Sequence, residues 1–278
     1  MQVTRKVLKF SSREEADWRL IPLGDDHLGH ANFDHDLHQK TIDYIADTPR
    51  TLWIGMGDYC DAITAKDHRY DPHAVDPRWP TPDKQYRAIT EMFKPIADKC
   101  IGLLDGNHDL RHWKDHNHNY VDGLAYDLKV PYLTITAYTR LVFQRESGKQ
   151  PKHNQFNIYA HHGWTSSRTA GGRVLRIQDL AKTFPGLPLY LMGHVHVRGE
   201  APPKVNLSVD KHLRIIHREE RFVFTGGYLK GYLPGAASYV EEQGYVPTSL
   251  GSPVIEIKVN DSARPPKSPF TITVGEVP

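Results

Sequence analysis

The sequence has little cysteine and no long apolar run. Its 278 residues include only Cys60 and Cys100, too few for a disulfide framework, so we expect a protein of the reducing cytoplasm. No stretch approaches the ~18 consecutive apolar residues of a membrane-spanning helix, so we expect no membrane association. The N-terminus alternates basic and apolar side chains and lacks the apolar centre of a secretory signal. Hydrophobic residues at 39% and charged residues at 24% exclude a disordered chain and a coiled coil.

Histidine, by contrast, is abundant at 17 residues, and the net charge of +2 hides an uneven distribution. Residues 25–109 hold 16 acidic and 9 basic side chains, whereas residues 110–278 hold 14 acidic and 21 basic ones. An acidic half can hold divalent cations, and a basic half can face an anionic substrate. Two solvated surfaces that average out explain the same numbers, and charge alone favours that alternative.

Hydrophobic periodicity predicts an alternating β/α half followed by a mostly β half. Helical patterns begin at Asp34, a suitable N-cap, and at Thr81, where Pro82 suits the first turn. The predicted helices cover residues 34–47, 81–98, 117–128 and 172–184. The predicted strands cover residues 18–23, 51–56, 100–104, 156–160 and 187–192, then 205–209, 212–216, 221–225 and 254–259.

This order of elements predicts an α/β protein in which two sheets pack together with helices outside. The chain shows no linker long or polar enough to divide it, so we expect one domain over residues 1–278. Within it, a β-rich part is expected at residues 200–260 and an irregular tail at residues 261–278.

Five of the predicted strands end in the same way, with Asp, Asn or His directly after the apolar run. Ligands of open α/β sheets bind outside the carboxyl ends of the strands, so we expect these side chains in one crevice. Glycine precedes the polar residue in four of the five places, which permits a sharp turn and close backbone approach. The polar residues are Asp25, Asp26 and His27; Asp58; Asn107, His108 and Asp109; His161 and His162; and His194 and His196.

The side-chain types at these strand ends match a binuclear metal site. Carboxylate, imidazole and amide oxygen suit Mn, Fe, Co or Zn better than a metal that prefers thiolate. His194 and His196 stand two residues apart, so both can point toward neighbouring ions, and Asp58 is placed to be shared between them. A turn residue or a hydrogen-bonded surface histidine explains any one of these positions, but not five strand ends in order.

In these residues the sequence resembles the calcineurin-like metallophosphoesterases, whose motifs are D-x-H, G-D, G-N-H-D/E, H and G-H-x-H. All five blocks occur here in that order, and they span residues 25–196, about 60% of the chain. The resemblance implies a four-layer αββα sandwich with two mixed central β-sheets, and two divalent metal ions.

The resemblance also implies a role for each residue of the five blocks. His108 would contact the phosphoryl oxygens or protonate the leaving group, and Asp109 would orient it. His161 is assigned as the ligand because it is the first histidine of its block, which leaves His162 between substrate contact and support. One ion would then take Asp25, His27, Asp58 and His196, and the other Asp58, Asn107, His161 and His194, with Asp58 bridging.

One position departs from a branch of the family. Purple acid phosphatases carry tyrosine three residues after the bridging aspartate, where this sequence has Asp61. A ferric-tyrosinate site is therefore not expected, and two divalent ions are, with Mn favoured and Fe, Zn, Ni or Co as alternatives. Two such ions about 3.5–4 Å apart can generate hydroxide from water and clamp the phosphoryl oxygens.

The stretch between the two histidine blocks is basic and glycine-containing, with Trp164 beside it. Such a loop fits a nucleotide or a nucleic-acid backbone, so Arg168, Arg173 and His162 are the predicted substrate contacts. The alternative is that Arg173 is an exposed position at the start of an ordinary helix. The long, proline-containing segment 61–80 is a second candidate wall of the groove.

Three hypotheses about function follow. The first is a phosphodiesterase that cleaves DNA, RNA or a nucleotide diester, since the tyrosine-containing C-terminal stretch resembles that of DNA-repair-type exonucleases. The second is a phosphomonoesterase acting on a small phosphate or a phosphoprotein. The third is a non-catalytic scaffold, which is disfavoured because every ligand of the five blocks and His108 are retained.

Overall fold

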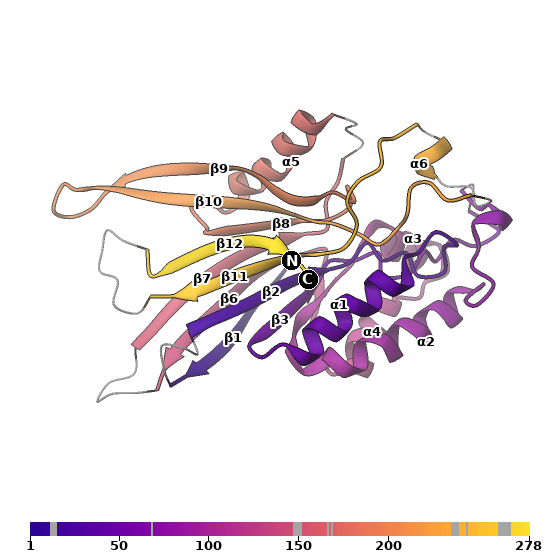
Figure 1. The fold of residues 1–278 in the computed structure, drawn as a ribbon, viewed down its shortest axis with the longest axis horizontal. Coiled ribbons are helices and arrows are strands. Elements are labelled where there is room, and N and C mark those ends of the chain that lie inside the picture. Colours follow the sequence, from indigo (N-terminus) through magenta and orange to yellow (C-terminus); the bar gives the residue numbers. More distant parts are fainter. Residues whose placement is uncertain are drawn as a thin grey trace.

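Two six-stranded mixed sheets form the centre of the protein (Figure 1). The computed structural model describes residues 1–11, 16–67, 69–146, 152–165, 167, 169–234, 239–242, 244–260 and 268–278. Sheet 1 has the order β1 (Gln2–Phe10), β6 (Thr136–Arg145), β7 (Lys152–His161), β8 (Leu189–Met192), β10 (Ile215–Thr225) and β9 (Arg198–Val209). Sheet 2 has the order β12 (Phe270–Glu276), β11 (Pro253–Val259), β2 (Asp17–Leu23), β3 (Thr51–Gly55), β4 (Cys100–Leu104) and β5 (Tyr132–Thr134).

The strands that end at the predicted site residues are mostly paired in parallel. Strands β2, β3, β4 and β5 are parallel to one another, and β7 and β10 are each parallel to β8. Antiparallel pairs join β6 to β7, β9 to β10, and β11 to both β2 and β12. The prediction of an α/β protein with two mixed sheets is therefore confirmed.

The helices lie on the outer faces of the two sheets (Figure 1). Sheet 2 carries α1 (His35–Asp47), α2 (Pro82–Phe93) and α4 (Tyr120–Leu128), and sheet 1 carries α5 (Ala170–Thr183). The remaining helices are short or lie at the strand ends: η2 (Pro72–Ala74), η3 (Lys94–Lys99), α3 (Asn107–His116) and α6 (Tyr239–Glu242).

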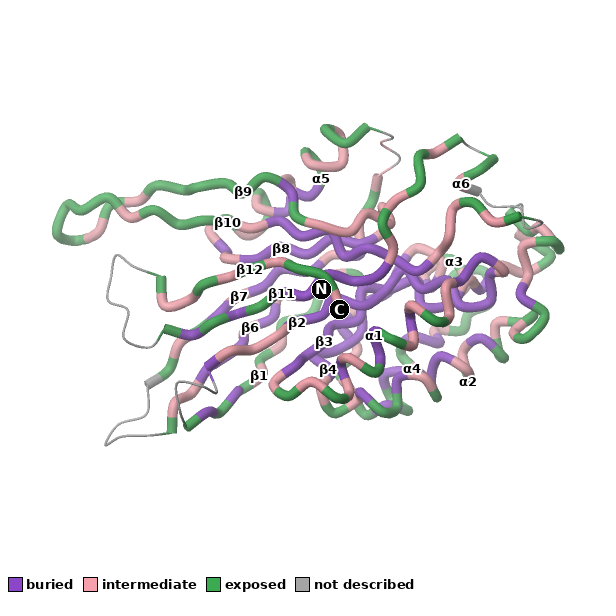
Figure 2. Tube along the Cα trace, viewed as in Figure 1, coloured by how far each residue is buried: buried purple, intermediate pink, exposed green. Residues whose placement is uncertain are grey.

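Three buried apolar clusters correspond to the three contacts between layers. The central one brings residues such as Leu20 and Ile54 of sheet 2 against Phe143 and Ile158 of sheet 1. The second packs the other face of sheet 2 against α1, α2 and α4, and the third packs sheet 1 against α5. Figure 2 shows buried residues along the strands of both sheets, whereas the far part of the β9–β10 ribbon is exposed.

Several predicted helices are confirmed with shifted boundaries. Asp34 caps α1, because its side chain accepts a hydrogen bond from the Leu37 backbone N–H at 3.3 Å. The helix predicted over residues 81–98 divides into α2 and η3 at Lys94. Pro95 follows directly and has no backbone N–H to donate to the preceding turn, which accounts for the change of helix type.

The prediction of an irregular tail over residues 261–278 was wrong for its second part. Residues 261–267 lie outside the described residues, but Phe270–Glu276 form β12, antiparallel to β11. The reason is the alternation of Phe270, Ile272 and Val274, which pack against the central core from the sheet edge. Strands β1, β5 and β6 and helix α3 were not predicted. The strands predicted over residues 205–209, 212–216 and 221–225 become the longer β9–β10 ribbon, whereas the strand predicted over residues 254–259 is confirmed as β11.

Lys99 joins η3 to the C-terminal end of α1. Its ammonium group donates to the backbone carbonyls of Ile45 at 2.6 Å, Ala46 at 2.7 Å and Thr48 at 3.1 Å. These carbonyls end the helix, where a cation also meets the negative end of the helix dipole. We predict that Lys99→Met lowers the free energy of unfolding by about 1–2 kcal/mol in urea titrations. Lys94→Met is the matched control, with an expected loss below about 0.5 kcal/mol for its exposed ion pair with Glu91; equal losses would contradict the capping role.

Candidate metal centre

The carboxyl ends of strands from both sheets converge on one buried site. Asp25 and His27 follow β2, Asp58 follows β3, Asn107 follows β4, and His194 and His196 follow β8. The two sheets are linked there, because the His194 backbone N–H donates to Asp25 Oδ2 at 2.8 Å. The predicted convergence of these six residues is what the structure shows.

The first group in the site consists of Asp25, His27 and His196. His196 Nε2 lies 3.2 Å from His27 Nε2 and 3.5 Å from Asp25 Oδ1. The ligand atoms of the three side chains all lie within 4.8 Å of one another, so they can surround one metal ion.

The second group consists of Asp58, His162 and His194, with the amide of Asn107 between them. One end of that amide lies 3.0 Å from His162 Nε2, 2.7 Å from His194 Nδ1 and 3.2 Å from Asp58 Oδ2. With the amide oxygen at this end, the oxygen faces only hydrogen-bond acceptors, and a cation placed among them would satisfy them all. In the flipped orientation the amide nitrogen would donate its protons to the same three atoms.

Asp58 lies between the two groups. Its Oδ2 atom is 3.4 Å from His162 Nε2 in the second group and 3.8 Å from His27 Nε2 in the first. Its Oδ1 atom accepts a hydrogen bond from the His108 backbone N–H at 2.8 Å. The carboxylate is therefore fixed through one oxygen while the other faces both groups.

His162, and not His161, belongs to the second group, which corrects the sequence-based assignment of His161 as a ligand. His162 Nδ1 donates to the Met56 carbonyl at 2.7 Å, so its Nε2 lone pair points at Asn107 and Asp58. His161 Nδ1 instead accepts from the Gly163 backbone N–H at 2.8 Å, and its ring lies against Trp164. The signal was available: alternation along β7 puts Ile158 and Ala160 in the central core, and therefore His162 on that same side.

The backbone of the site is strained. Asp25, His27, Asp58, His194 and His196 all have left-handed conformations, with φ values of 51°, 49°, 54°, 69° and 50°. Non-glycine residues adopt this region rarely, and such outliers cluster at functional sites. Close approach adds to the constraint at Gly57, where φ is +92° and a Cβ atom would lie 2.3 Å from the Gly106 nitrogen. The tight packing of these turns is what brings the side chains together.

Asp109 does not orient His108, contrary to the sequence-based expectation. Its buried Oδ2 atom accepts hydrogen bonds from the backbone N–H groups of Asp58 and Gly106, both at 2.7 Å. Asp109 therefore ties the turn after β3 to the turn after β4. His108 is oriented by the Asp61 carbonyl, to which its Nδ1 donates at 2.7 Å.

Asp61, three residues after Asp58, is a site residue that the motifs do not predict. Its Oδ1 atom lies 3.5 Å from His27 Nδ1, on the side of the ring opposite His196. Burial lowers the pKa of His27, but the carboxylates of Asp61 and Asp58 outweigh it and raise that pKa to about 9. Asp61 thus fixes the orientation of His27 in the first group.

Burial and mutual charge dominate the electrostatics of the site. Burial raises the pKa of Asp25 to about 7. For His162, burial lowers the pKa, but the Asp58 carboxylate outweighs it and raises that pKa to about 10. Metal ions bound at the site would compete with protons for these side-chain atoms.

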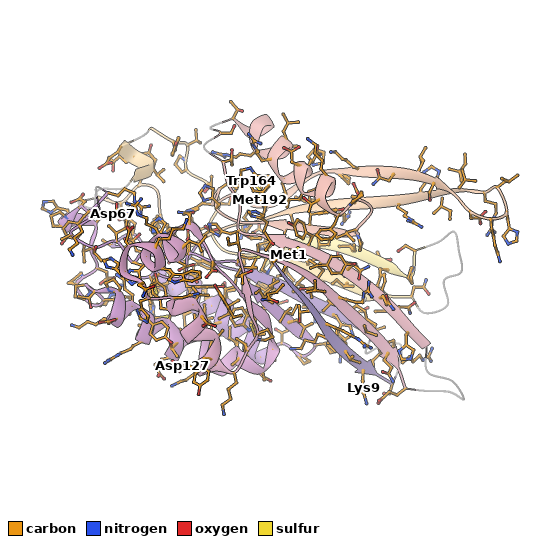
Figure 3. The ribbon with its side chains drawn as sticks, turned by 180° about the vertical axis from the view of Figure 1, so that it is seen from behind. Met1, Lys9, Asp67, Asp127, Trp164 and Met192 are labelled. Carbon is orange, nitrogen blue, oxygen red and sulfur yellow. The ribbon has the colours of Figure 1, made fainter. Side chains whose placement is uncertain are left out.

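The structure describes two of the three predicted substrate contacts, Arg173 and His162, and gives each of them a different partner. Arg173 lies in the first turns of α5, and its Nε donates to the Ser167 carbonyl at 3.3 Å. Arg168 lies outside the described residues. His162 belongs to the second group, as shown above. Figure 3 labels Trp164 near Met192, at the carboxyl ends of β7 and β8.

Comparison of the chain with protein-family models and with curated proteins finds no match. Among the described residues, no helix is both long enough and apolar enough to cross a membrane. Conclusions about function therefore depend on the geometry of the site and on the motifs themselves.

The two neighbouring histidines provide a direct test of the site. We predict that His162→Ala weakens Mn²⁺ binding in the second group by at least about 100-fold, because it removes a ligand atom, whereas His161→Ala leaves binding unchanged. Isothermal titration of the metal-free variants measures both. Loss of binding in His161→Ala with normal binding in His162→Ala would contradict the assignment.

Proposed function

We propose that this chain is a phosphoesterase of the calcineurin-like type that would use two divalent ions, held by residues on either side of Asp58, to hydrolyse a phosphodiester in a nucleotide or nucleic acid. One observation carries the proposal: strand ends of two sheets bring two metal-competent groups together on either side of one buried carboxylate. The five sequence motifs stand in the order that this family has, which supports the same proposal.

The residues present fit two such ions. Asp25 Oδ1 is fully buried and accepts no hydrogen bond from the described residues. The donor atoms are carboxylate, imidazole and amide, which suit Mn and its neighbours in the first transition series. Both cysteines are buried in the core between sheet 2 and its helices, so thiolate does not enter the donor set. Mn²⁺ is therefore the first ion to supply.

When bound, two divalent ions would supply a nucleophile from water and positive charge against the phosphoryl oxygens. The protein's contribution centres on His108. Its Nδ1 proton is held by the Asp61 carbonyl, so Nε2 is the ring nitrogen that can exchange a proton, and Arg69 Nη1 lies 3.2 Å from it. Burial lowers the pKa of His108, but a phosphoryl anion beside the ring would favour the protonated form. His108 can then donate from Nε2 to the leaving oxygen.

We expect phosphodiester turnover to require the bridging carboxylate. With Mn²⁺ present, the wild-type protein should hydrolyse bis-p-nitrophenyl phosphate and end-labelled DNA, and Asp58→Asn should lower kcat/KM at least about 100-fold. Asp127→Asn is the matched control, since Asp127 accepts from Tyr86 at the surface and should leave turnover unchanged. Hydrolysis of p-nitrophenyl phosphate alone would contradict the phosphodiesterase proposal and indicate a phosphomonoesterase. Hydrolysis of none of these esters would indicate a non-catalytic scaffold.

Substitution of His108 should lower the rate of hydrolysis without changing metal binding. We predict that His108→Ala lowers kcat by about 10²–10⁴-fold, the usual contribution of a general acid, while the Mn²⁺ content measured by mass spectrometry stays at the wild-type level. Unchanged turnover with intact metal content would remove His108 from the mechanism. A loss of metal would show instead that the His108 ring is itself a ligand, because its ring nitrogen lies with His27 and Asp58 in a group that could hold an ion.

A further inference from the structure

A pocket of about 250 Å³ opens beside His108, between helix α3 on one side and residues 61–67 with Arg69 on the other. Its wall includes Asp61 and His108, which belong to the candidate metal centre, so the pocket is continuous with that centre. Its volume lies just below the ~300–1,000 Å³ of typical small-molecule pockets. The pocket therefore has room for one compact group next to the reacting phosphorus.

The pocket wall carries three cationic side chains, and it also carries the carboxylates of Asp61, Asp67 and Asp115. Lys66 and Arg69 lie on one side, and Arg111 comes from α3, three residues after His108 and hence on the same helix face. Arg111 is paired with Asp115 at the surface, and Lys66 is exposed. Arg69 differs from both, because it is held in a defined direction.

Asp67, which is labelled in Figure 3, holds the guanidinium group of Arg69 through two side-chain hydrogen bonds, an arrangement that we call the clamp. Arg69 Nε donates to Asp67 Oδ1 at 3.1 Å and Arg69 Nη2 donates to Oδ2 at 2.8 Å, while the Arg69 backbone N–H also donates to Oδ1 at 2.9 Å. This two-pronged contact fixes the plane of the guanidinium group. The remaining nitrogen, Nη1, lies 3.2 Å from His108 Nε2.

The contact between Arg69 and His108 places a guanidinium donor in front of the reacting position. His108 Nδ1 donates to the Asp61 carbonyl, so Nε2 of the neutral ring accepts the hydrogen bond from Arg69 Nη1. Nε2 is also the atom that must face the leaving oxygen. A phosphoryl oxygen is a stronger acceptor for a guanidinium N–H than an imidazole nitrogen is.

We propose that Arg69, positioned by Asp67, is a substrate-binding residue that donates from Nη1 to a phosphoryl oxygen, and that the adjoining pocket receives one compact leaving group, such as a single nucleoside. This assignment rests on the proposed phosphoesterase function. Binding of the phosphoryl group replaces the contact between Arg69 and His108, which frees His108 Nε2 to face the leaving oxygen. Because Asp67 holds Nε and Nη2, Nη1 is the Arg69 donor directed at the phosphoryl oxygen.

The chain offers a matched control for Arg69. Arg78 makes the same clamp two residues after an aspartate, with Nη2 donating to Asp76 Oδ2 at 2.7 Å and Nε to Oδ1 at 3.1 Å. Its guanidinium group lies over the Trp79 ring at 4.5 Å, and Arg78 is not part of the pocket wall. Arg78→Gln therefore removes an equivalent clamp without affecting the site.

The test is isothermal titration of the Mn²⁺-loaded protein with thymidine 5′-monophosphate, with Mn²⁺ binding measured separately for each variant. We expect Arg69→Gln to weaken nucleotide binding by about 10-fold or more, because a hydrogen bond to a charged group is lost. Arg69→Lys should give an intermediate loss, because lysine keeps the charge without the fork. Arg78→Gln should bind nucleotide as the wild-type protein does, and Mn²⁺ binding should be unchanged in all three variants.

Two results would overturn the assignment of Arg69: wild-type affinity in Arg69→Gln, or no nucleotide binding by the Mn²⁺-loaded wild-type protein. Ester turnover distinguishes this failure from failure of the proposed function. If nucleotide binding depends on Arg69 but no ester is hydrolysed, the role of Arg69 is supported and the proposed phosphoesterase function is contradicted. If esters are hydrolysed at the same rate after Arg69→Gln, the phosphoesterase function is supported and the role of Arg69 is contradicted.

Discussion

Buried negative charge at the junction of the two sheets is the constraint on which the rest of the structure depends. Asp25, Asp58 and Asp109 are almost completely shielded from solvent. A buried carboxylate is tolerated only when hydrogen bonds and positive charge compensate it. Asp109 is compensated by backbone N–H groups, whereas Asp25 and Asp58 face the imidazoles of His27, His162 and His196. Two cations placed among these side chains would neutralise the same charge.

The fold keeps this arrangement in place despite its cost. Five site residues adopt left-handed backbone conformations, and each such conformation costs about 1–3 kcal/mol outside glycine. The apolar clusters between the sheets and beneath the helices supply stability away from the site, while cross-links between turns hold it together. The link from His194 to Asp25 joins the sheets, and Asp109 joins the turns after β3 and β4. The geometry of the site is thus held by contacts within the protein itself.

The sequence predicted those features of the fold and the site that depend on residues close together along the chain. The apolar runs that become β2, β3, β4 and β8, and the polar residues at their ends, could be recognised because parallel strands bury continuous apolar segments. The choice between His161 and His162 failed because motif order was preferred to strand alternation. The roles of Asp109, Asp61 and Arg69 depend on contacts between separate turns, which no spacing reveals. The alternation of Phe270, Ile272 and Val274 could have indicated strand β12, whereas its packing on Phe143 and Phe156 could not be read from the sequence.

The central claim is that the strand ends form one centre with two ions on either side of Asp58. Anomalous X-ray diffraction from crystals of the Mn²⁺-loaded protein tests it most directly. The account predicts two peaks about 3.5–4 Å apart, one beside Asp25, His27 and His196 and the other beside Asn107, His162 and His194. A single peak, or two peaks with His161 in contact and His162 turned away, would contradict it.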